Sequence, residues 1–385
     1  MQEIAKTCEQ YVAHTYKRFP VTLVRGKGAI LLDETGKKYI DLGSGIAVNA
    51  FGVADDKWAA AVTRQLTTLQ HTCNLYYAEP CAKLAEMLCE RTGMKKVFFS
   101  NSGAEANECM IKAARKYGEQ TGRDTIITLK DSFHGRTIAT LAATGQDVFH
   151  QHFGPFPAGL EYAQPNDLAS VQAIADAGTA CAVMLEIVQG EGGVRPLSGE
   201  FLRGVEQLCR EKDMLLLVDE VQTGNGRSGQ LYAYMCHDLS PDLVSTAKGL
   251  GGGLPIGATL FGEKVQDILT YGDHGSTFGG NPVCCAGGVS ILERIDETLL
   301  AGVRERSAYI VGQLEGAKGV RSVSGLGLML GIETDRPAAD IVNECIRRGV
   351  LLLTAKHKLR LLPALNIGCD ELREAIRILK EVIAG

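Results

Sequence analysis

Short apolar runs alternate along the chain with longer stretches whose apolar residues recur every three or four positions. The runs show no clean two-residue alternation, which is typical of strands covered on both faces. Helical patterns at Glu105 to Tyr117 and Phe201 to Lys212 lie between them. The order predicts an α/β fold with a mostly parallel sheet flanked by helices. The predicted strands are Val97 to Phe99, Thr125 to Leu129, Ala182 to Val188, Leu215 to Val218, Leu243-Val244 and Ile256 to Phe261.

The two ends of the chain differ from its middle. Residues 21–42 alternate like a small antiparallel unit around the turn at Glu34 to Lys37. Near the other end, short apolar runs precede an amphipathic helix at Asp370 to Ile383. This arrangement predicts a second, smaller α+β unit. Its expected strands lie in Val320 to Glu333, Leu351 to Leu353 and Leu359 to Leu362.

Length and composition indicate a globular protein of two domains. At 385 residues the chain exceeds the size at which one core normally stops growing. We expect a large domain at residues 51–282 and a small C-terminal domain at 283–385, which the N-terminal segment 1–50 joins. A hydrophobic fraction of 45% with 22% charged residues excludes wholesale disorder. The net charge of −5 gives no basic patch for nucleic acid.

Cysteine spacing and the N-terminal residues predict the compartment. Twelve cysteines are scattered from Cys8 to Cys369 without a C-x-x-C pair, which fits neither a zinc ribbon nor a disulfide framework. His150 and His152 lack a third ligand at a recognised spacing, so we expect no metal site. The start has no apolar signal region, and no run of eighteen or more apolar residues follows. These features predict a cytoplasmic protein with reduced thiols and no membrane partner.

Two charged residues stand where neighbouring strands are expected to end. Asp219 closes the apolar run from Leu215, and Lys248 follows the short run Asp242 to Thr246. In parallel neighbours, both side chains reach the carboxyl edge of the sheet, where open α/β folds bind ligands. An amine and a carboxylate in one pocket suit pyridoxal phosphate chemistry, in which the lysine forms the Schiff base and the aspartate keeps the pyridine nitrogen protonated. Each residue alone is as well explained as a loop acid or a solvated lysine.

Two further motifs follow strands at the same expected edge. Ser100 to Glu108 opens a helix, where small residues and free N–H groups suit a phosphate, although an ordinary N-cap by Ser102 also explains it. Phe133 suits stacking on a planar ring and Arg136 suits a substrate carboxylate. The alternatives are a core aromatic and a surface arginine.

Two glycine-rich loops add polar side chains. Glu191 lies between glycines after the Ala182 run and is suited to neutralise a basic residue, or is a solvated loop acid. Gly275 to Pro282 offers the hydroxyls of Ser276 and Thr277 for phosphate or substrate, or is a flexible turn.

A rival interpretation comes from Gly224 to Gly229, which matches G-x-G-x-x-G after a strand and suggests a nucleotide-dependent dehydrogenase. Only about a dozen residues separate Gly229 from the Asp242 run, too few for a full crossover helix. A non-catalytic binding protein on the same fold is another alternative, against which the presence of both Lys248 and Asp219 argues.

Six runs, in this order and spacing, resemble the class III (ornithine-type) pyridoxal phosphate aminotransferases. Gly43 to Gly52 and the compact length are similar to the acetylornithine branch, while succinylornithine, N-succinyl-diaminopimelate and ornithine stay open as amine donors. The resemblance implies fold type I, a homodimer with both sites at the interface, and transfer of a terminal amino group to 2-oxoglutarate. The six runs are SNSGAEANE, FHGRT, QGEGGV, LLLVDEVQTGNGR, STAKGLGGGLPIGA and HGSTFGGNP.

The resemblance also implies a role for each site residue. Lys248 links covalently to the cofactor, and Asp219 pairs with the pyridine nitrogen. Gln222 reaches the phenolic oxygen, and Thr277 contacts the phosphate from the partner subunit. The other cofactor contacts implied are Ser102, Gly103 and Ala104 at the phosphate, with Phe133 and Val221 on the two ring faces. The implied substrate-binding residues are Arg136, Glu191, Ser276 and Arg360.

The chain departs from the family pattern in two places. Arg360 is kept, but Ala364 stands where a second proline is usual. Gly52-Val53 lacks the usual histidine after the glycine. The roles of the loop at residues 52–56 and of Ala364 therefore stay open.

Overall fold

The computed structural model describes residues 3–385, and its centre is a seven-stranded sheet. Strand β12 pairs antiparallel with both of its neighbours, and the other strands share one direction. The mostly parallel sheet expected from the sequence is confirmed. In spatial order the strands are β4 (Lys96–Ser100), β12 (Gly257–Phe261), β11 (Leu243–Thr246), β10 (Leu215–Asp219), β7 (Ala180–Leu185), β5 (Thr125–Leu129) and β6 (Leu160–Ala163).

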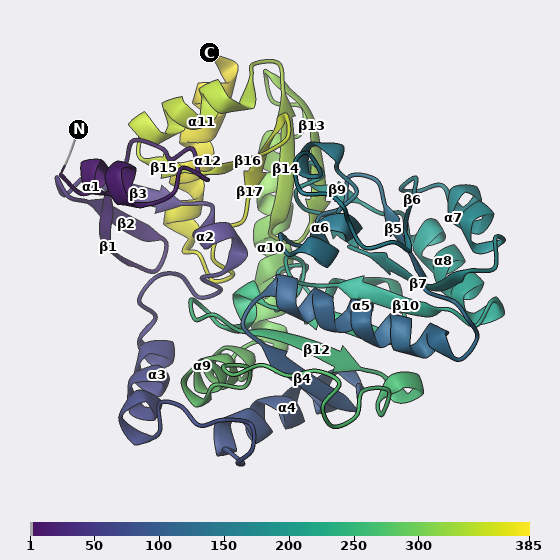
Figure 1. The fold of residues 1–385 in the computed structure, drawn as a ribbon. Coiled ribbons are helices and arrows are strands. Elements are labelled where there is room, and N and C mark those ends of the chain that lie inside the picture. The colour runs from purple at the N-terminus through teal and green to yellow at the C-terminus, as the bar shows by residue number, and fades with distance from the viewer. Residues whose placement is uncertain (1–2) are drawn as a thin grey trace.

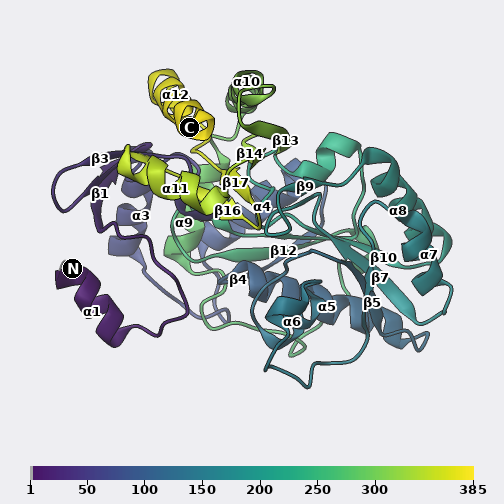
Figure 2. The same ribbon diagram turned by 90° about the horizontal axis from the view of Figure 1, so that it is seen from above.

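Helices cover both faces of this sheet, as Figure 2 shows. Strands β5, β7, β10 and β11 are buried at every position, which explains why they form continuous apolar runs in the sequence. One face carries α5 (Gly103–Glu119) and α6 (Ile138–Ala143), and the other carries α7 (Leu168–Ala175) and α8 (Gly199–Glu211). Helix α4 (Glu79–Thr92) lies beside β4, and α9 (Pro282–Leu292) packs against both α4 and α3 (Asp56–Thr68) (Figure 1).

The N-terminal strands form a small sheet with a strand from the far end of the chain. Strands β1 (Leu23–Lys27), β2 (Ile30–Asp33) and β3 (Lys38–Asp41) are antiparallel. Strand β3 then pairs in parallel with β15 (Val350–Leu351), with Ile40 opposite Val350. Figure 1 shows this sheet beside the C-terminal helices α11 (Ala338–Arg347) and α12 (Cys369–Ala384). The division into domains at residues 51–282 and 283–385 stays a prediction.

A second small sheet has the order β13 (Val320–Leu326), β14 (Met329–Thr334), β17 (Lys358–Leu361) and β16 (Leu353–Ala355). It packs beside α10 (Glu297–Leu314). The run expected at Leu351 to Leu353 is therefore divided between two sheets, with Leu351 in β15 and Leu353 in β16.

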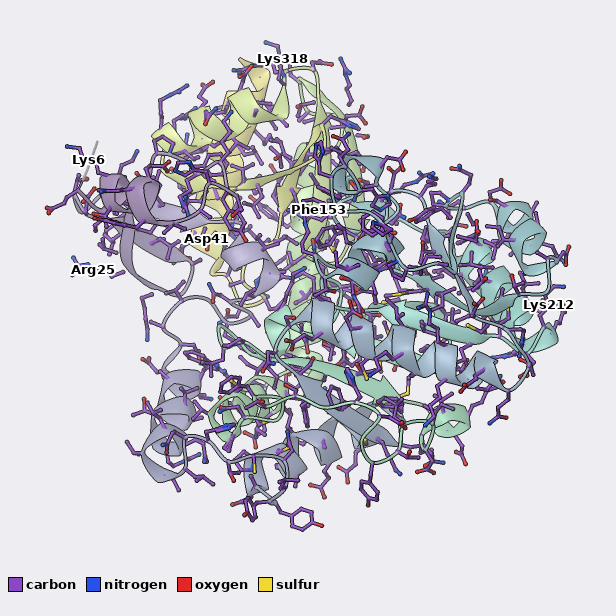
Figure 3. The ribbon with its side chains drawn as sticks, viewed as in Figure 1. Lys6, Arg25, Asp41, Phe153, Lys212 and Lys318 are labelled. Atoms are coloured by element: carbon purple, nitrogen blue, oxygen red, sulfur yellow. The ribbon has the colours of Figure 1, made fainter. Side chains whose placement is uncertain are left out.

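Short elements complete the chain. Asp41, labelled in Figure 3, ends β3, and its Oδ1 accepts the N–H groups of Gly43 at 2.8 Å and Ser44 at 3.0 Å before α2 (Ser44–Ala47). No helix in residues 3–385 is long and apolar enough to cross a membrane. The remaining elements are α1 (Glu3–Tyr11), the hairpin of β8 (Val188–Gln189) with β9 (Arg195–Pro196), and short 3-10 turns.

Candidate active site

A cavity of about 480 Å³ opens where the parallel strands end. Its volume lies in the usual range for small-molecule sites, and its place at the carboxyl edge is the one expected for an open α/β sheet. Residues that follow five different strands line it. They are Asn101 to Ala104 after β4, Phe133 to Arg136 after β5, Glu186 after β7, Asp219, Val221 and Gln222 at the end of β10, and Lys248 after β11.

Asp219 ends β10 with both carboxylate oxygens hydrogen-bonded. Its Oδ1 accepts the backbone N–H of Val221 at 3.0 Å, and its Oδ2 accepts the side-chain amide of Asn107 at 2.7 Å. His134 Nδ1 lies 2.8 Å from the same Oδ2. Burial opposes a charged imidazole, but the hydrogen bond and charge of Asp219 raise the pKa of His134 above its usual value. Neither Asn107 nor His134 was predicted from the sequence to belong to the site.

Lys248 follows β11 in a left-handed backbone conformation, with φ of 46°. This conformation costs a non-glycine residue about 1–3 kcal/mol and clusters at functional sites. Burial lowers the pKa of the Lys248 ammonium, against the opposing charges of Asp219 and Glu191. A larger fraction of the amine is therefore neutral, which is the nucleophilic form.

The start of α5 combines a helix cap with an open N-terminus. Ser102 is the N-cap residue, and its side chain accepts the N–H of Glu105 at 3.2 Å. The capping interpretation of this motif is correct, yet the first-turn N–H groups of Gly103 and Ala104 still lack helical partners. A Cβ atom on Gly103 would lie 2.6 Å from Val221 Cγ1. Only glycine allows this close approach.

The loop after β5 brings Phe133 and Arg136 to the cavity wall. The Arg136 guanidinium carbon lies 5.2 Å from the centroid of the Phe133 ring and 4.0 Å from that of Phe149. Stacking of this kind orients the guanidinium plane without using its N–H donors. Arg136 is exposed, so its charge is accessible to an anion that enters the cavity.

Arg360, on β17, forms an ion pair with Glu191 beside the cavity. Its Nη1 lies 2.5 Å from Glu191 Oε1 and 3.2 Å from Gln222 Oε1. The Arg360 side chain is 4% exposed and that of Glu191 31% exposed, so the carboxylate is the partner nearer to solvent. Arg360 Nε has no hydrogen-bond partner within residues 3–385. The ion pair is connected to the cavity by Gln222, which bonds to Arg360 and lines the cavity.

Ser276 and Thr277 do not line this cavity. They lie in a neighbouring hollow with Asn74 and Cys81. The Ser276 hydroxyl accepts the side-chain amide of Asn101 at 3.1 Å, which ties its loop to the start of α5. The contact expected of Thr277 with the partner subunit's site stays a prediction.

Two buried carboxyls, Glu186 and Glu220, stand at the ends of the adjacent strands β7 and β10. Burial, with a smaller contribution from the charge of Asp219, raises the pKa of each to about 7. Glu186 lines the cavity, whereas Glu220 lies outside it.

We expect the free energy of unfolding of the ligand-free chain to fall as the pH rises from about 5 to about 8. A carboxyl whose pKa is raised in the folded state stabilises the fold below its unfolded value of 4.5, and this contribution is lost as the pH rises through about 7. The loss is at most about 3 kcal/mol per carboxyl. Urea unfolding at about pH 5 and at about pH 8 measures this change in the free energy of unfolding. Glu186→Gln and Glu220→Gln should each reduce the pH dependence, and an unchanged dependence in both variants would contradict the assignment.

The motifs that suggested other chemistry have structural explanations. Gly224 to Gly229 forms turns, and no α-helix follows it before β11. His150 Nε2 lies 2.9 Å from the carbonyl oxygen of Leu141 and 2.8 Å from that of Thr144. In the described part of the chain, no group of three or more His, Cys, Asp or Glu side chains is placed to hold a metal ion.

Comparison with known proteins identifies the family. The model of the class III aminotransferases matches residues 11–383. The chain belongs to the class III aminotransferases. The class III assignment and the α/β fold expected from the sequence are confirmed.

The relatives of this class III aminotransferase are similar over nearly their whole length. The acetylornithine aminotransferase of Haemophilus ducreyi is 49% identical over 387 aligned residues, which cover 99% of this chain and 98% of the relative. That of Aquifex aeolicus is 45% identical, with 97% and 100% covered.

Solved structures agree with this class III fold. The ornithine aminotransferase of Toxoplasma gondii superposes with a TM-score of 0.94 at 30% identity, over 99% of this chain and 94% of that one. That structure holds pyridoxal phosphate at partial occupancy in its active site. The N-acetylornithine aminotransferase of Stenotrophomonas maltophilia gives 0.83 at 36% identity, with 98% of each chain covered.

Proposed function

We propose that this class III aminotransferase uses pyridoxal 5′-phosphate to transfer the terminal amino group of N2-acetylornithine to 2-oxoglutarate. The products are N-acetylglutamate semialdehyde and glutamate, a step of arginine biosynthesis. The observation that carries the proposal is that Asp219, at the end of β10, and Lys248, just after the adjacent parallel strand β11, line one cavity. The choice of acetylornithine rests on relatives with that name at 42–49% identity.

The residues of the cavity fit pyridoxal phosphate. The open start of α5, where a side chain on Gly103 would collide with Val221, suits the phosphate. The buried Asp219 carboxylate suits a protonated ring nitrogen, and Lys248 suits the covalent link. When bound, the cofactor supplies an electron sink for the carbon that loses its proton. Ser102, Gly103 and Ala104 would hold the phosphate, Phe133 and Val221 would cover the ring faces, and Gln222 would reach the phenolic oxygen.

The protein's own side chains then bind, orient and move protons. Lys248 Nζ would take the proton from the substrate carbon that bears the reacting amine and would carry it to the cofactor, since returning it to the same carbon would regenerate the starting amine. Asp219 keeps the proton on the ring nitrogen, because a carboxylate fixed by Asn107 and His134 cannot turn away. Arg136 would bind the α-carboxylate of acetylornithine. Ser276 lies outside this cavity, so it would come near the substrate only in the site of a partner subunit.

The pairing of Glu191 with Arg360 lets one cavity accept two dissimilar amine donors. Glutamate brings a carboxylate beside its reacting carbon, whereas acetylornithine has only methylene groups there. An unpaired buried arginine facing those methylenes is costly. We propose that Glu191 neutralises Arg360 while acetylornithine reacts and swings toward solvent when glutamate binds. The greater exposure of Glu191 supports this direction of movement.

We expect Glu191→Ala to favour glutamate and impair acetylornithine, and Arg360→Ala to harm the glutamate half-reaction most. Removing one partner of a buried charge pair costs about 2–5 kcal/mol, so each selective loss should be at least about tenfold. Single-turnover rates of the two half-reactions, measured separately by stopped flow, test this expectation. Equal losses in both halves for either variant would rule out the switch.

We also propose that the chain acts as a homodimer with shared sites. Leu75, Tyr77, Tyr271 and Phe278 are from 61% to 108% exposed, an unusual set of apolar side chains for a free surface. Leu75 lines the hollow in which Ser276 and Thr277 lie, Tyr271 lines an adjacent hollow that shares Leu75, and Phe278 directly follows Thr277 in the chain. A partner that covered this surface would bring Thr277 to a second cavity. Sedimentation should give twice the chain mass of 41.3 kDa.

The amine donor is tested by comparing kcat/KM for acetylornithine, succinylornithine, N-succinyl-diaminopimelate and ornithine with 2-oxoglutarate as acceptor. Acetylornithine should give the highest value, and a higher value for another amine would reassign the substrate. The twelve cysteines, all unpaired, support the proposed cytoplasmic location.

A further inference from the structure

Glu186 joins two loops of the cavity wall through their backbones. Its Oε2 accepts the N–H of Phe133 at 2.9 Å, and its Oε1 accepts the N–H of Gly190 at 3.1 Å. Phe133 lies three residues before Arg136, and Gly190 directly precedes Glu191. One carboxylate that is 5% exposed therefore holds both loops that carry the proposed substrate-binding residues.

The loop that follows Gly190 has little room to move as a unit. A Cβ on Gly190 would lie 2.7 Å from Gln222 Cδ, and one on Gly192 would lie 2.4 Å from the carbonyl oxygen of Asp131. Asp131 belongs to the loop of Phe133, so the two loops are in direct contact as well. The Glu191 side chain, between these fixed glycines, is partly exposed and can turn while its backbone stays in place.

We infer that Glu186 is a positioning residue that fixes the separation between Arg136 and the pair of Glu191 and Arg360. Side-chain movement of Glu191 then leaves the carboxylate-binding end of the cavity undisturbed. The substrate-binding roles of Arg136, Glu191 and Arg360 in this inference rest on the proposed function, but the two hydrogen bonds of Glu186 do not. His134, Asp219 and Lys248 are the charged groups that act on Glu186.

Glu186→Gln tests the inference in the ligand-free protein. The amide keeps the size of the side chain but has one acceptor oxygen, so one of the two N–H groups loses its partner. At about pH 8, hydrogen exchange at Phe133 or at Gly190 should accelerate at least about tenfold. The kcat/KM for the amine donor should fall by at least about the same factor, through KM more than through kcat.

Glu220→Gln is the matched control. Glu220 is equally buried, and it accepts the N–H of Tyr234 at 2.7 Å and the hydroxyl of Thr223 at 2.5 Å, but it does not line the cavity. Exchange in both loops and kcat/KM should stay within about threefold of wild type. If Glu186→Gln does not fold, Glu186→Asp gives the same readout, because the shorter side chain cannot span both N–H groups.

Two results would overturn the inference. One is unchanged exchange in both loops of the Glu186 variant, and the other is the same acceleration in the Glu220 control. A wild-type chain that does not convert acetylornithine would refute the proposed substrate instead. The exchange comparison would still decide the role of Glu186.

Discussion

Replacing Lys248 by Ala should abolish turnover while the chain still folds and binds pyridoxal phosphate without a covalent link. The amine is the only nucleophile proposed at the cavity, and the same Nζ is proposed to move the proton of the substrate carbon. Loss of a positioned acid–base group alone costs about 10²–10⁴-fold, so we expect at least about 10³-fold here. Steady-state rates with excess cofactor measure the fall. Borohydride reduction followed by mass spectrometry should attach the cofactor at Lys248 in wild type and nowhere in the variant.

Lys264→Ala serves as the control for this experiment. Lys264 is an exposed lysine whose ammonium lies 2.8 Å from Asp213 Oδ1, outside the cavity. Its loss should leave turnover and the attachment site unchanged. Near-native turnover in the Lys248 variant would place the covalent link on another residue.

Asp219→Asn should lower kcat by about 10²-fold or more, the usual effect of removing one preorganised electrostatic group. A neutral amide cannot hold the proton on the ring nitrogen as a carboxylate does. The amide also brings two N–H donors to a place where Val221, Asn107 and His134 already donate. Whichever way the new amide turns, its NH₂ group therefore points at another N–H donor.

A second readout of Asp219→Asn needs no cofactor. Without the carboxylate, burial is the largest effect on His134, so the pKa of its imidazole should fall below its present raised value. A titration of His134 by NMR in the ligand-free variant measures this change. Asp242→Asn is the control, since Asp242 precedes the adjacent strand β11, is partly buried and does not line the cavity. Activity of Asp219→Asn within a few-fold of wild type would contradict the proposed role of Asp219 in keeping the ring nitrogen protonated.

The central sheet was predictable from the sequence because its strands are covered on both faces. The run Thr125 to Leu129 coincides with β5, and Leu215 to Val218 is extended in β10 only by Asp219. The run Ala182 to Val188 is interrupted after Leu185, since the chain turns at Glu186 to bond two loops before β8 begins. An apolar run cannot reveal such a turn, nor can it show that β12 runs against its neighbours.

The residues that hold Asp219 were missed for different reasons. Asn107 lies on the buried face of α5 with Ala106, Met110 and Ile111 around it. A single polar residue on an apolar helix face is a signal that could have drawn attention to it. His134 was missed because its contact with Asp219 joins residues that follow β5 and end β10, two strands that are not adjacent in the sheet.

The pairing of β3 with β15 has a consequence for how the chain is made. Ile40 and Val350 are roughly 300 residues apart, so a ribosome working at about 5–20 residues per second leaves β3 without its neighbour for about 15–60 s. During that time the N-terminal strands present an unpaired edge, which is a template for association with other nascent chains. Completion of the N-terminal sheet is therefore a late event in the synthesis and folding of the chain. We therefore expect chaperones to be needed during synthesis mainly to cover the unpaired edge of β3. The central sheet should need them less, because its last strand, β12, is already made when Phe261 is added.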